Sequence, residues 1–282
     1  MKHIVSFSGG RTSAYLAHLL KQKQINEGWD VEYVFMDTGA EHPKTYDFIR
    51  NCVDHFDIDL VCIRPVIHEE LGVGTTYKEV PIESLKWDLS VWDQMTNKYG
   101  NPYAPLGGFC TDRLKTTIYK KYIKQFDETT TWIGIRADEK RRLKAREGVR
   151  YLAEISPMDK IDIIGWWRQM PFDLEIEEHL GNCVFCIKKG VNKVALAIKD
   201  EPELAKEWEQ MTKTSREMGW NDDGSPITAM YRGKLDINGI SKMYEDVDRG
   251  ELHMSLTHAK RFESGSCTES CEVFGCQMDM FE

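Results

Sequence analysis

The chain has 282 residues, of which 41% are hydrophobic and 29% charged, and its formal net charge is −9. These values are typical of a soluble globular protein with one or two domains. No apolar run approaches the roughly 20 residues that cross a bilayer, and the apolar start is too short for a signal peptide. We therefore expect a cytoplasmic protein with no membrane segment. The negative charge argues against a surface that coats nucleic acid generally.

The first third of the chain alternates short apolar runs with helical patterns. Strands are predicted at residues 4–7, 31–36 and 60–64, and helices at residues 13–24 and 44–56. Strands separated by helices need crossover connections, so the expected fold is α/β, a doubly wound and mainly parallel sheet with helices on both faces. Ligands bind such sheets beyond the carboxyl ends of the strands.

The middle of the chain is less regular. Residues 71–109 contain prolines, glycines and tryptophans without a clear period, which predicts a long loop or lid. A helix at residues 111–125 and a strand at residues 130–135 are expected to follow.

The last part of the chain changes character, with a CxxC, predicted helices at residues 192–199 and 201–218, and a tail that carries cysteines. We therefore predict two domains. Residues 1–165 form a nucleotide-binding domain, and residues 166–282 form a smaller, helical, cysteine-rich region.

A glycine loop follows the first predicted strand and opens the first helix. It reads Ser8, Gly9, Gly10, Arg11, Thr12 and Ser13. The glycines let the backbone pass close to a ligand, and the amides at the start of the helix present positive partial charge to an anion. The spacing is not that of a Walker loop. We predict a phosphate site, with an ordinary glycine turn as the alternative.

Two segments resemble known motifs. SFSGGRTSAY is similar to the SGGxxS PP-loop of ATP pyrophosphatases, and residues 35–45, FMDTGAEHPKT, resemble the DTGxxxPxT segment of the phosphoadenosine phosphosulfate (PAPS) reductase family. The resemblance implies an adenine nucleotide alpha hydrolase-like fold that binds ATP and Mg²⁺. It places Asp37, Thr38 and Gly39 beside the ribose, the adenine or the metal; a helix cap is their alternative role.

The resemblance covers most of the chain. Residues 109–115 are similar to the family's CTxxLK segment and residues 132–139 to its GxRxDE segment, and the region from Trp166 to Cys186 looks like the phage and mobile-element branch. By this resemblance Arg136 and Lys115 would neutralise charge that develops on the phosphates during transfer.

The eight cysteines lie in a chain with no recognised export signal, which favours metal or sulfur chemistry over a disulfide framework. Cys183 and Cys186 have the spacing of a metal half-site. Cys110, with Cys276 or Cys271 from the tail, would complete a tetrathiolate for a [4Fe-4S] cluster or for Zn²⁺, and a redox or sulfur-relay dithiol is a third reading. Cys271 is the expected nucleophile or persulfide carrier. Cys52 and Cys62, in apolar surroundings, are expected in the core.

Three functions remain open. The leading function is a PP-loop ATP pyrophosphatase that adenylates a substrate for sulfur transfer. The chain has an intact glycine loop and lacks an ECGxH-like nucleophile, and both features differ from the sulfonucleotide reductases proper. The second is a PAPS reductase-like enzyme that releases sulfite, and the third is a metal-stabilised nucleotide-binding or sensing module without turnover.

The expected partners follow from these functions. They are an adenine nucleotide, an acceptor for which nucleic acid is one candidate, a sulfur donor or reductant protein, and a second copy of the chain in a homo-oligomer. The basic segment at residues 140–146 fits either a solvated helical face or a local anion-binding patch.

Overall fold

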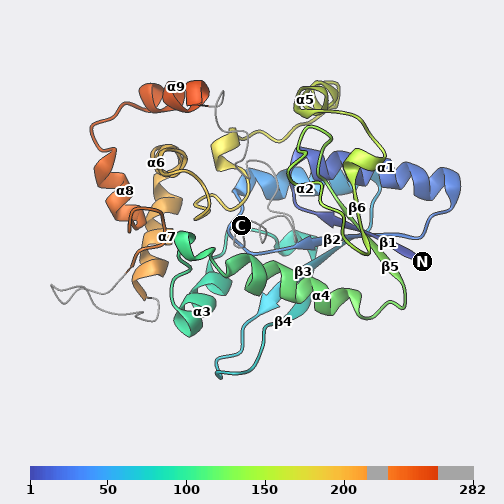
Figure 1. Ribbon diagram of the computed structural model, residues 1–282, viewed down its shortest axis with the longest axis horizontal. Helices are drawn as coiled ribbons and strands as arrows, with labels where there is room; N and C mark the ends of the chain where they lie inside the picture. Colours follow the sequence, from blue (N-terminus) through green and yellow to red (C-terminus); the bar gives the residue numbers. More distant parts are fainter. Residues whose placement is uncertain (215–227, 260–282) are drawn as a thin grey trace.

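The amino-terminal half of the chain folds around a six-stranded sheet in the order β4-β3-β2-β1-β5-β6. The computed structural model describes residues 1–214 and 228–259 (Figure 1). The strands are β1 (Lys2–Phe7), β2 (Val31–Met36), β3 (Leu60–Val66), β4 (Thr76–Val80), β5 (Thr129–Ile133) and β6 (Val149–Tyr151). All neighbours pair in parallel except β3 and β4, which are antiparallel. The expected doubly wound, mainly parallel sheet is confirmed.

The strand order reverses at β1. The chain moves from β1 to β2 and β3 on one side and later places β5 on the other side, so β1 lies between β2 and β5. Crevices at such switch points are where ligands bind in open α/β sheets. The turns that follow β1 and β5 therefore meet at one edge of the sheet.

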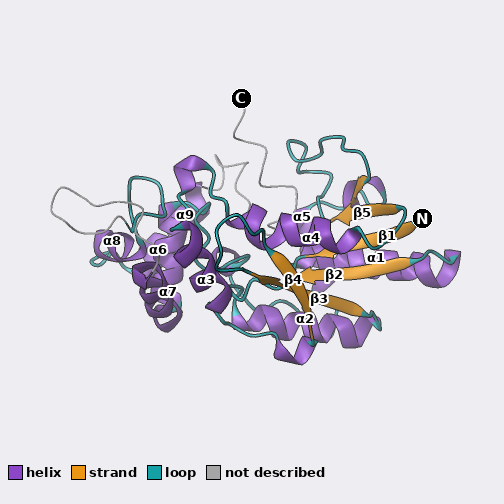
Figure 2. Cartoon of the chain, turned by 90° about the horizontal axis from the view of Figure 1, so that it is seen from below, coloured by secondary structure: helices purple, strands orange, loops and turns teal. Residues whose placement is uncertain are grey.

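Helices cover both faces of the sheet (Figures 1 and 2). On one face lie α1 (Arg11–Glu27), α2 (Pro43–Phe56) and α5 (Lys160–Trp167), and on the other lies α4 (Thr117–Ile123), preceded by a π-helical turn at Asp112–Thr116. The first face buries aromatic residues from both the strands and the helices, and the second buries Ile118, Tyr119 and Tyr122 against the sheet. Cys52 and Cys62 are buried in the first core, as predicted.

A helical lobe packs beside the sheet. It contains α3 (Ser90–Tyr99), α6 (Val191–Asp200), α7 (Pro202–Thr214), α8 (Ile237–Met243) and α9 (Arg249–Ala259). Trp92 of α3 meets Trp208 of α7 with ring centroids 4.8 Å apart, so a helix from the first half of the chain helps to build this core. The expected boundary at residue 165 falls inside α5, and Trp167 and Leu174 beyond it pack in the core of the sheet.

The prediction of a long loop at residues 71–109 is wrong. This segment contains the edge strand β4, the helix α3 and two short 3₁₀ turns. No residue of β4 is buried. Its sequence therefore lacks the strong alternation of apolar and polar residues that predicts a half-buried strand. The ten residues of α3 are too few for a clear helical period, and the helix depends on packing against α7.

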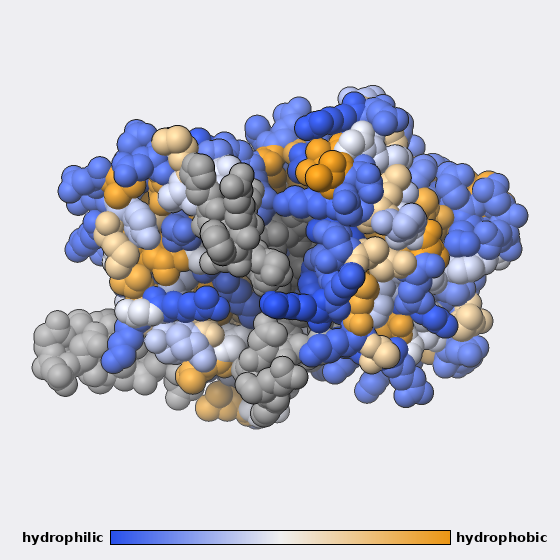
Figure 3. All heavy atoms as spheres, turned by 45° about the horizontal axis from the view of Figure 1, so that its top comes forward, coloured by the Kyte–Doolittle hydropathy of each residue, from blue (hydrophilic) through white to orange (hydrophobic). Residues whose placement is uncertain are grey.

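The surface gives few signs of a large apolar contact. The face in Figure 3 is mostly hydrophilic, with apolar side chains in separate patches. Single exposed apolar residues such as Leu106 and Ile161 are ordinary on protein surfaces. In residues 1–214 and 228–259 no helix has both the length and the apolar character that crossing a membrane requires.

Trp167 links α5 to the start of α1. Its indole N–H donates to the carbonyl oxygen of Arg11 at 3.0 Å, and its buried ring lies 4.9 Å from that of Phe48. We expect Trp167→Ala to lower the free energy of unfolding by about 3–5 kcal/mol through loss of packing. Trp167→Phe should lose less, about 1–2 kcal/mol, chiefly through the hydrogen bond.

Urea unfolding followed by circular dichroism measures both changes. Trp166→Ala is the matched control, because the adjacent Trp166 is only partly buried and should cost clearly less. Equal losses for the two alanine variants would contradict this role for Trp167.

Candidate functional site

The loop after β1 is closed by the Ser13 hydroxyl. Ser13 Oγ accepts from the Ser8 backbone N–H at 3.1 Å and from the Ser8 hydroxyl at 3.0 Å, and it donates to the Gly10 carbonyl at 2.9 Å. The Ser13 side chain is fully buried. Its hydroxyl therefore shapes the loop around the site that the sequence predicts for phosphate.

Gly9 gives the loop its conformation. Its φ of +79° lies in the left-handed region, and a Cβ there would lie 3.0 Å from both Ile49 Cδ1 and Thr45 Cγ2. Within the described residues no side chain caps the amino end of α1 at Gly10, and the first turn of α1 holds no acidic residue. The amides at the start of α1 are thus available to an anion.

This loop forms one wall of a narrow cleft. The cleft is lined by Ser8, Gly9, Gly10, Arg11, Glu41, Thr45, Leu174, Ile176, Glu177, Glu178, Gly181 and Asn182. The Arg11 guanidinium is held at the rim by the Asp173 carboxylate, with contacts of 2.6 and 3.1 Å. The wall opposite the loop comes from residues 174–182, which follow α5.

The turn after β5 packs directly against the loop. A Cβ on Gly134 would lie 3.1 Å from both Cα and N of Ser13, so only glycine lets the two turns approach this closely without displacement. Arg136, which is buried, donates from Nη1 to the Thr12 hydroxyl at 3.2 Å. Asp138 orients the Arg136 guanidinium from its other side at 2.9 Å. The structure therefore brings the predicted Arg136 next to the predicted phosphate loop.

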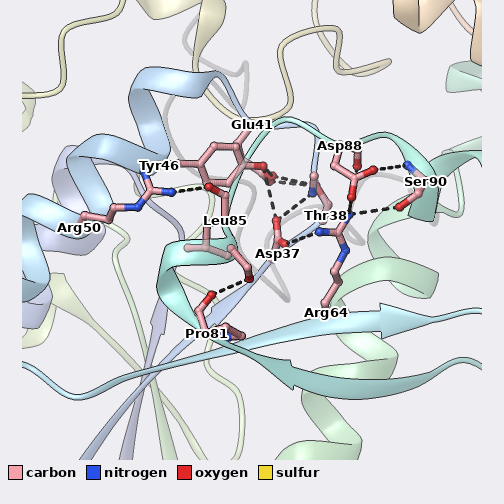
Figure 4. Close-up of polar contacts among 12 residues, drawn as sticks. Asp37, Thr38, Glu41, Tyr46, Arg50, Arg64, Pro81, Leu85, Asp88 and Ser90 are labelled. Carbon is pink, nitrogen blue, oxygen red and sulfur yellow. Dashed lines mark hydrogen bonds and ion pairs between the residues drawn. The ribbon is translucent and has the colours of Figure 1, made fainter.

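The end of β2 carries a buried acidic network (Figure 4). Asp37 Oδ1 accepts from the Gly39 N–H at 3.0 Å and from the Tyr46 hydroxyl at 3.5 Å, and its Oδ2 lies 3.3 Å from Arg64 Nη1. Burial, with the nearby Glu41 carboxylate, raises the pKa of Asp37 to about 6, against the opposing effect of Arg64. The cap of α2 is His42, so Asp37, Thr38 and Gly39 are not needed for capping.

Glu41 lies at the centre of the site, although the sequence reading did not select it. Its carboxylate accepts from the Thr38 hydroxyl at 3.0 Å and from Tyr46 at 3.3 Å, and Lys115 Nζ lies 3.3 Å away. Both Glu41 and Lys115 are buried. Only the three-dimensional pairing reveals this residue, because in the sequence it is one charged residue within a matched motif.

A second, small cavity lies beside this pair. Cys110, Cys183 and Cys186 line it together with Lys115 and other residues, which are Thr38, Trp92, Thr111, Leu114, Ile187 and Lys188. Lys115 therefore faces the cysteines, while Glu41 faces the nucleotide cleft. Cavity and cleft share the wall formed by these two residues.

The loop that carries Cys183 is tied to the end of β2. The Val184 N–H donates to the Ala40 carbonyl at 2.9 Å, and Glu41 and Cys183 form a β-bridge. Lys189, buried behind the loop, donates to the carbonyls of His179, Cys183 and Val184 at 2.6–3.0 Å. These contacts give the CxxC loop a defined position beside the sheet.

The described cysteines suit a metal bound by thiolates, whereas Asp37 does not suit Mg²⁺. Three described thiols in one cavity, with none of them in a disulfide, suit a soft metal or an iron–sulfur cluster. Cys276 and Cys271, the predicted fourth ligand and nucleophile, lie outside the described residues. Asp37 does not fit a direct Mg²⁺ ligand, because Arg64, Gly39 and Tyr46 already engage its oxygens. The Glu41 side chain lines the cleft together with the glycine loop.

A further group of possible ligands, Glu177, His179 and Asp200, joins the cleft wall to the helical lobe. His179 Nε2 lies 2.7 Å from Asp200, and the Arg249 guanidinium contacts both carboxylates at 2.5–2.9 Å. The guanidinium already supplies a positive charge to these carboxylates. We therefore describe this group as an ion-pair network.

The fold and site together define an α/β protein whose glycine loop lies at the switch point of a parallel sheet. Residues 2–166 match the profile described as phosphoadenosine phosphosulfate reductase domain. The chain belongs to this PAPS reductase domain family.

Relatives place the chain more narrowly. It is 48% identical over 285 aligned residues, 99% of this chain and 97% of the relative, to an uncharacterized nin region protein, ORF290, of Escherichia phage lambda. The predicted resemblance to a phage branch is thus confirmed. An uncharacterized protein of Methanocaldococcus jannaschii is 39% identical over 59 residues, 21% of this chain and 13% of that protein. The crystal structure of PAPS reductase from Candida auris, a phosphate complex, aligns with a TM-score of 0.39 and 15% identity over 60% of this chain and 74% of that chain.

The raised pKa of Asp37 makes one contribution to stability depend on pH. In the folded protein this carboxyl holds its proton up to a pKa of about 6, against 3.8 in the unfolded chain. Its contribution is therefore fully present below pH 4 and is lost as the pH rises through 6, by at most about 3 kcal/mol. We expect wild type to lose stability relative to Asp37→Asn across this range. Urea unfolding of both proteins at several pH values tests it, and a pH-independent difference would contradict it.

The Glu41–Lys115 pair can be tested by a double-mutant cycle. We expect Glu41→Gln and Lys115→Met each to lower the free energy of unfolding by about 3–5 kcal/mol, because each leaves an uncompensated buried charge. The double variant should recover part of this loss. Glu27→Gln, at the exposed Lys23–Glu27 pair, is the control and should change stability by less than about 1 kcal/mol. Additive losses in the cycle would show that the pair is not coupled.

Proposed function

We propose that this protein is a PP-loop ATP pyrophosphatase that adenylates an acceptor, with sulfur transfer as the following step. An acceptor oxygen attacks the α-phosphorus of ATP, the bond from that phosphorus to the bridging oxygen breaks, and pyrophosphate leaves. A sulfur nucleophile then attacks the activated carbon or phosphorus of the acceptor and displaces AMP. The observation that carries the proposal is the intact glycine loop at the switch point, with Arg136 against Thr12.

The geometry of the cleft supports pyrophosphate as the leaving group. The loop and the uncapped start of α1 supply backbone donors that do not reorganise, and Ser13 and Gly134 hold them in place. Arg136 lies where it can stabilise charge that builds on the departing phosphates. Mg²⁺, the expected cofactor, would accompany the nucleotide phosphates in the cleft that Glu41 lines.

The shared wall supports sulfur chemistry next to the nucleotide. Cys110, Cys183 and Cys186 lie in the cavity behind Glu41 and Lys115. A [4Fe-4S] cluster held by these thiolates would supply sulfur or electrons, and Zn²⁺ would serve structure instead. Lys115 and Lys188 both line the cysteine cavity, and their positive charge favours anionic thiolates or an anionic cluster. The proposal therefore assigns Lys115 to the sulfur site, whereas the sequence resemblance assigns it to the phosphates.

A second function is favoured by the family and by the same cysteine cavity. In that case the loop would hold a sulfonucleotide, and the protein would reduce it to sulfite. Sulfite released from PAPS with thiol reductant, without ATP cleavage, would identify this activity. Tight nucleotide binding without any product would instead identify a binding or sensing module.

The first experiment is anaerobic incubation of the purified chain with Mg²⁺ and α-³²P-labelled ATP, with iron analysis and a visible spectrum. We expect AMP and pyrophosphate to appear when an acceptor is present, and iron to copurify. Pyrophosphate release that requires no cysteine would keep the adenylating step and remove the sulfur step. Intact ATP under all conditions, with sulfite from PAPS, would overturn the proposal.

Gly134→Ala tests the site itself. The new Cβ would lie 3.1 Å from Cα and N of Ser13, so the first turn of α1 must shift by a few tenths of an ångström. We expect kcat/KM for ATP to fall by about tenfold, since a misplacement of about 1 Å can cost an enzyme about 100-fold. Gly165→Ala in α5 is the matched control, because its Cβ meets nothing within 4 Å and should slightly stabilise the helix. Unchanged kinetics in the Gly134 variant would remove the loop from the active site.

A further inference from the structure

The chain between β5 and β6 is a loop. A solvated helical face is one of the two explanations that the sequence offers for its basic residues. Residues 134–148 contain turns and no helix. Leu143 packs against the buried cluster of Ile133, Ile135 and Tyr151, and the Tyr151 hydroxyl donates to the Lys144 carbonyl at 2.6 Å. A solvated helical face therefore does not account for this run of charge.

The loop begins at the nucleotide cleft. Thr12 of the phosphate loop accepts from Arg136, the Arg136 backbone N–H donates to Glu139 at 3.0 Å, and Glu139 is paired with Arg142. These contacts connect the start of the loop to the cleft at the carboxyl end of β5. The loop then returns to the amino end of the parallel strand β6, where Thr131 pairs with Val149.

The charge of the loop is concentrated and exposed. Residues 140–150 contain six basic residues and one acidic residue, in a chain of net charge −9. Lys140, Arg141 and Lys144 are exposed. Arg146 and Arg150 line an adjoining groove together with Glu147 and Glu154, and Arg150 is paired with Glu154 at 2.7 Å. Such a local basic surface on an acidic protein is suited to a polyanion.

We infer that this loop docks the phosphate backbone of a DNA duplex and that this DNA carries the acceptor, which rests on the adenylating function proposed above. The exposed side chains of Lys140, Arg141 and Lys144 would contact successive phosphates. Residues 137–150 contain no aromatic side chain, so stacking on bases is absent from this part of the loop. Binding should therefore depend on salt and tolerate different sequences.

The test uses fluorescence anisotropy of a labelled, mixed-sequence DNA duplex with the full chain at several salt concentrations. The loop variant is Lys140→Ala/Arg141→Ala/Lys144→Ala, and the control is Lys120→Ala/Lys121→Ala/Lys124→Ala, which removes the same charge from exposed residues at α4. We expect the loop variant to bind at least tenfold more weakly at low salt, with a log–log salt slope smaller by roughly 3. The control should bind DNA within about twofold of wild type, because the proposal places no phosphate contact at these residues of α4.

Other outcomes overturn the inference. These are no binding by the wild type, equal losses in the two variants, or displacement of the DNA by polyglutamate or phosphatidylserine vesicles as readily as by unlabelled DNA. The loop variant should bind ATP with the affinity of wild type, because the substituted residues do not line the cleft. If DNA binding responds as expected and ATP is never cleaved, the docking surface stands and the proposed function fails.

Discussion

The close contact between the turns after β1 and β5 is the constraint on which the site depends. Parallel pairing of β1 with β5 brings both turns to one edge, and the missing side chain of Gly134 lets the β5 turn lie against Ser13. This approach places Arg136 within hydrogen-bond distance of Thr12. A larger residue at position 134 would separate the phosphate loop from the arginine that is expected to serve it.

A buried ion pair forms the boundary between the cleft and the cysteine-lined cavity. Glu41 faces the cleft and Lys115 faces the cysteines, and each provides the opposite charge that makes burial of the other tolerable. Further hydrogen bonds from Thr38 and Tyr46 complete the environment of the Glu41 carboxylate. A single wall of side chains therefore separates the nucleotide cleft from the thiols.

The helical lobe contributes to the site through its attachment to β2. The bond from Val184 to Ala40 and the bridge between Glu41 and Cys183 carry the CxxC loop to the end of the strand. Lys189 draws three carbonyls of that region together. The cysteines are consequently placed by contacts with the nucleotide-binding half, and the two lobes form one site.

Local patterns in the sequence determined the glycine loop between β1 and α1, the alternating strands and helices of the first third, and the family. These depend on glycine geometry and on apolar periods that neighbouring residues carry by themselves. Tertiary structure decided what long-range contacts govern: that β4 is an edge strand, that α3 joins the helical lobe, that Glu41 meets Lys115, and that residues 134–148 form a loop that begins beside the cleft. No local period encodes such pairings, because their partners lie tens of residues away in the chain and meet only when the sheet closes the distance.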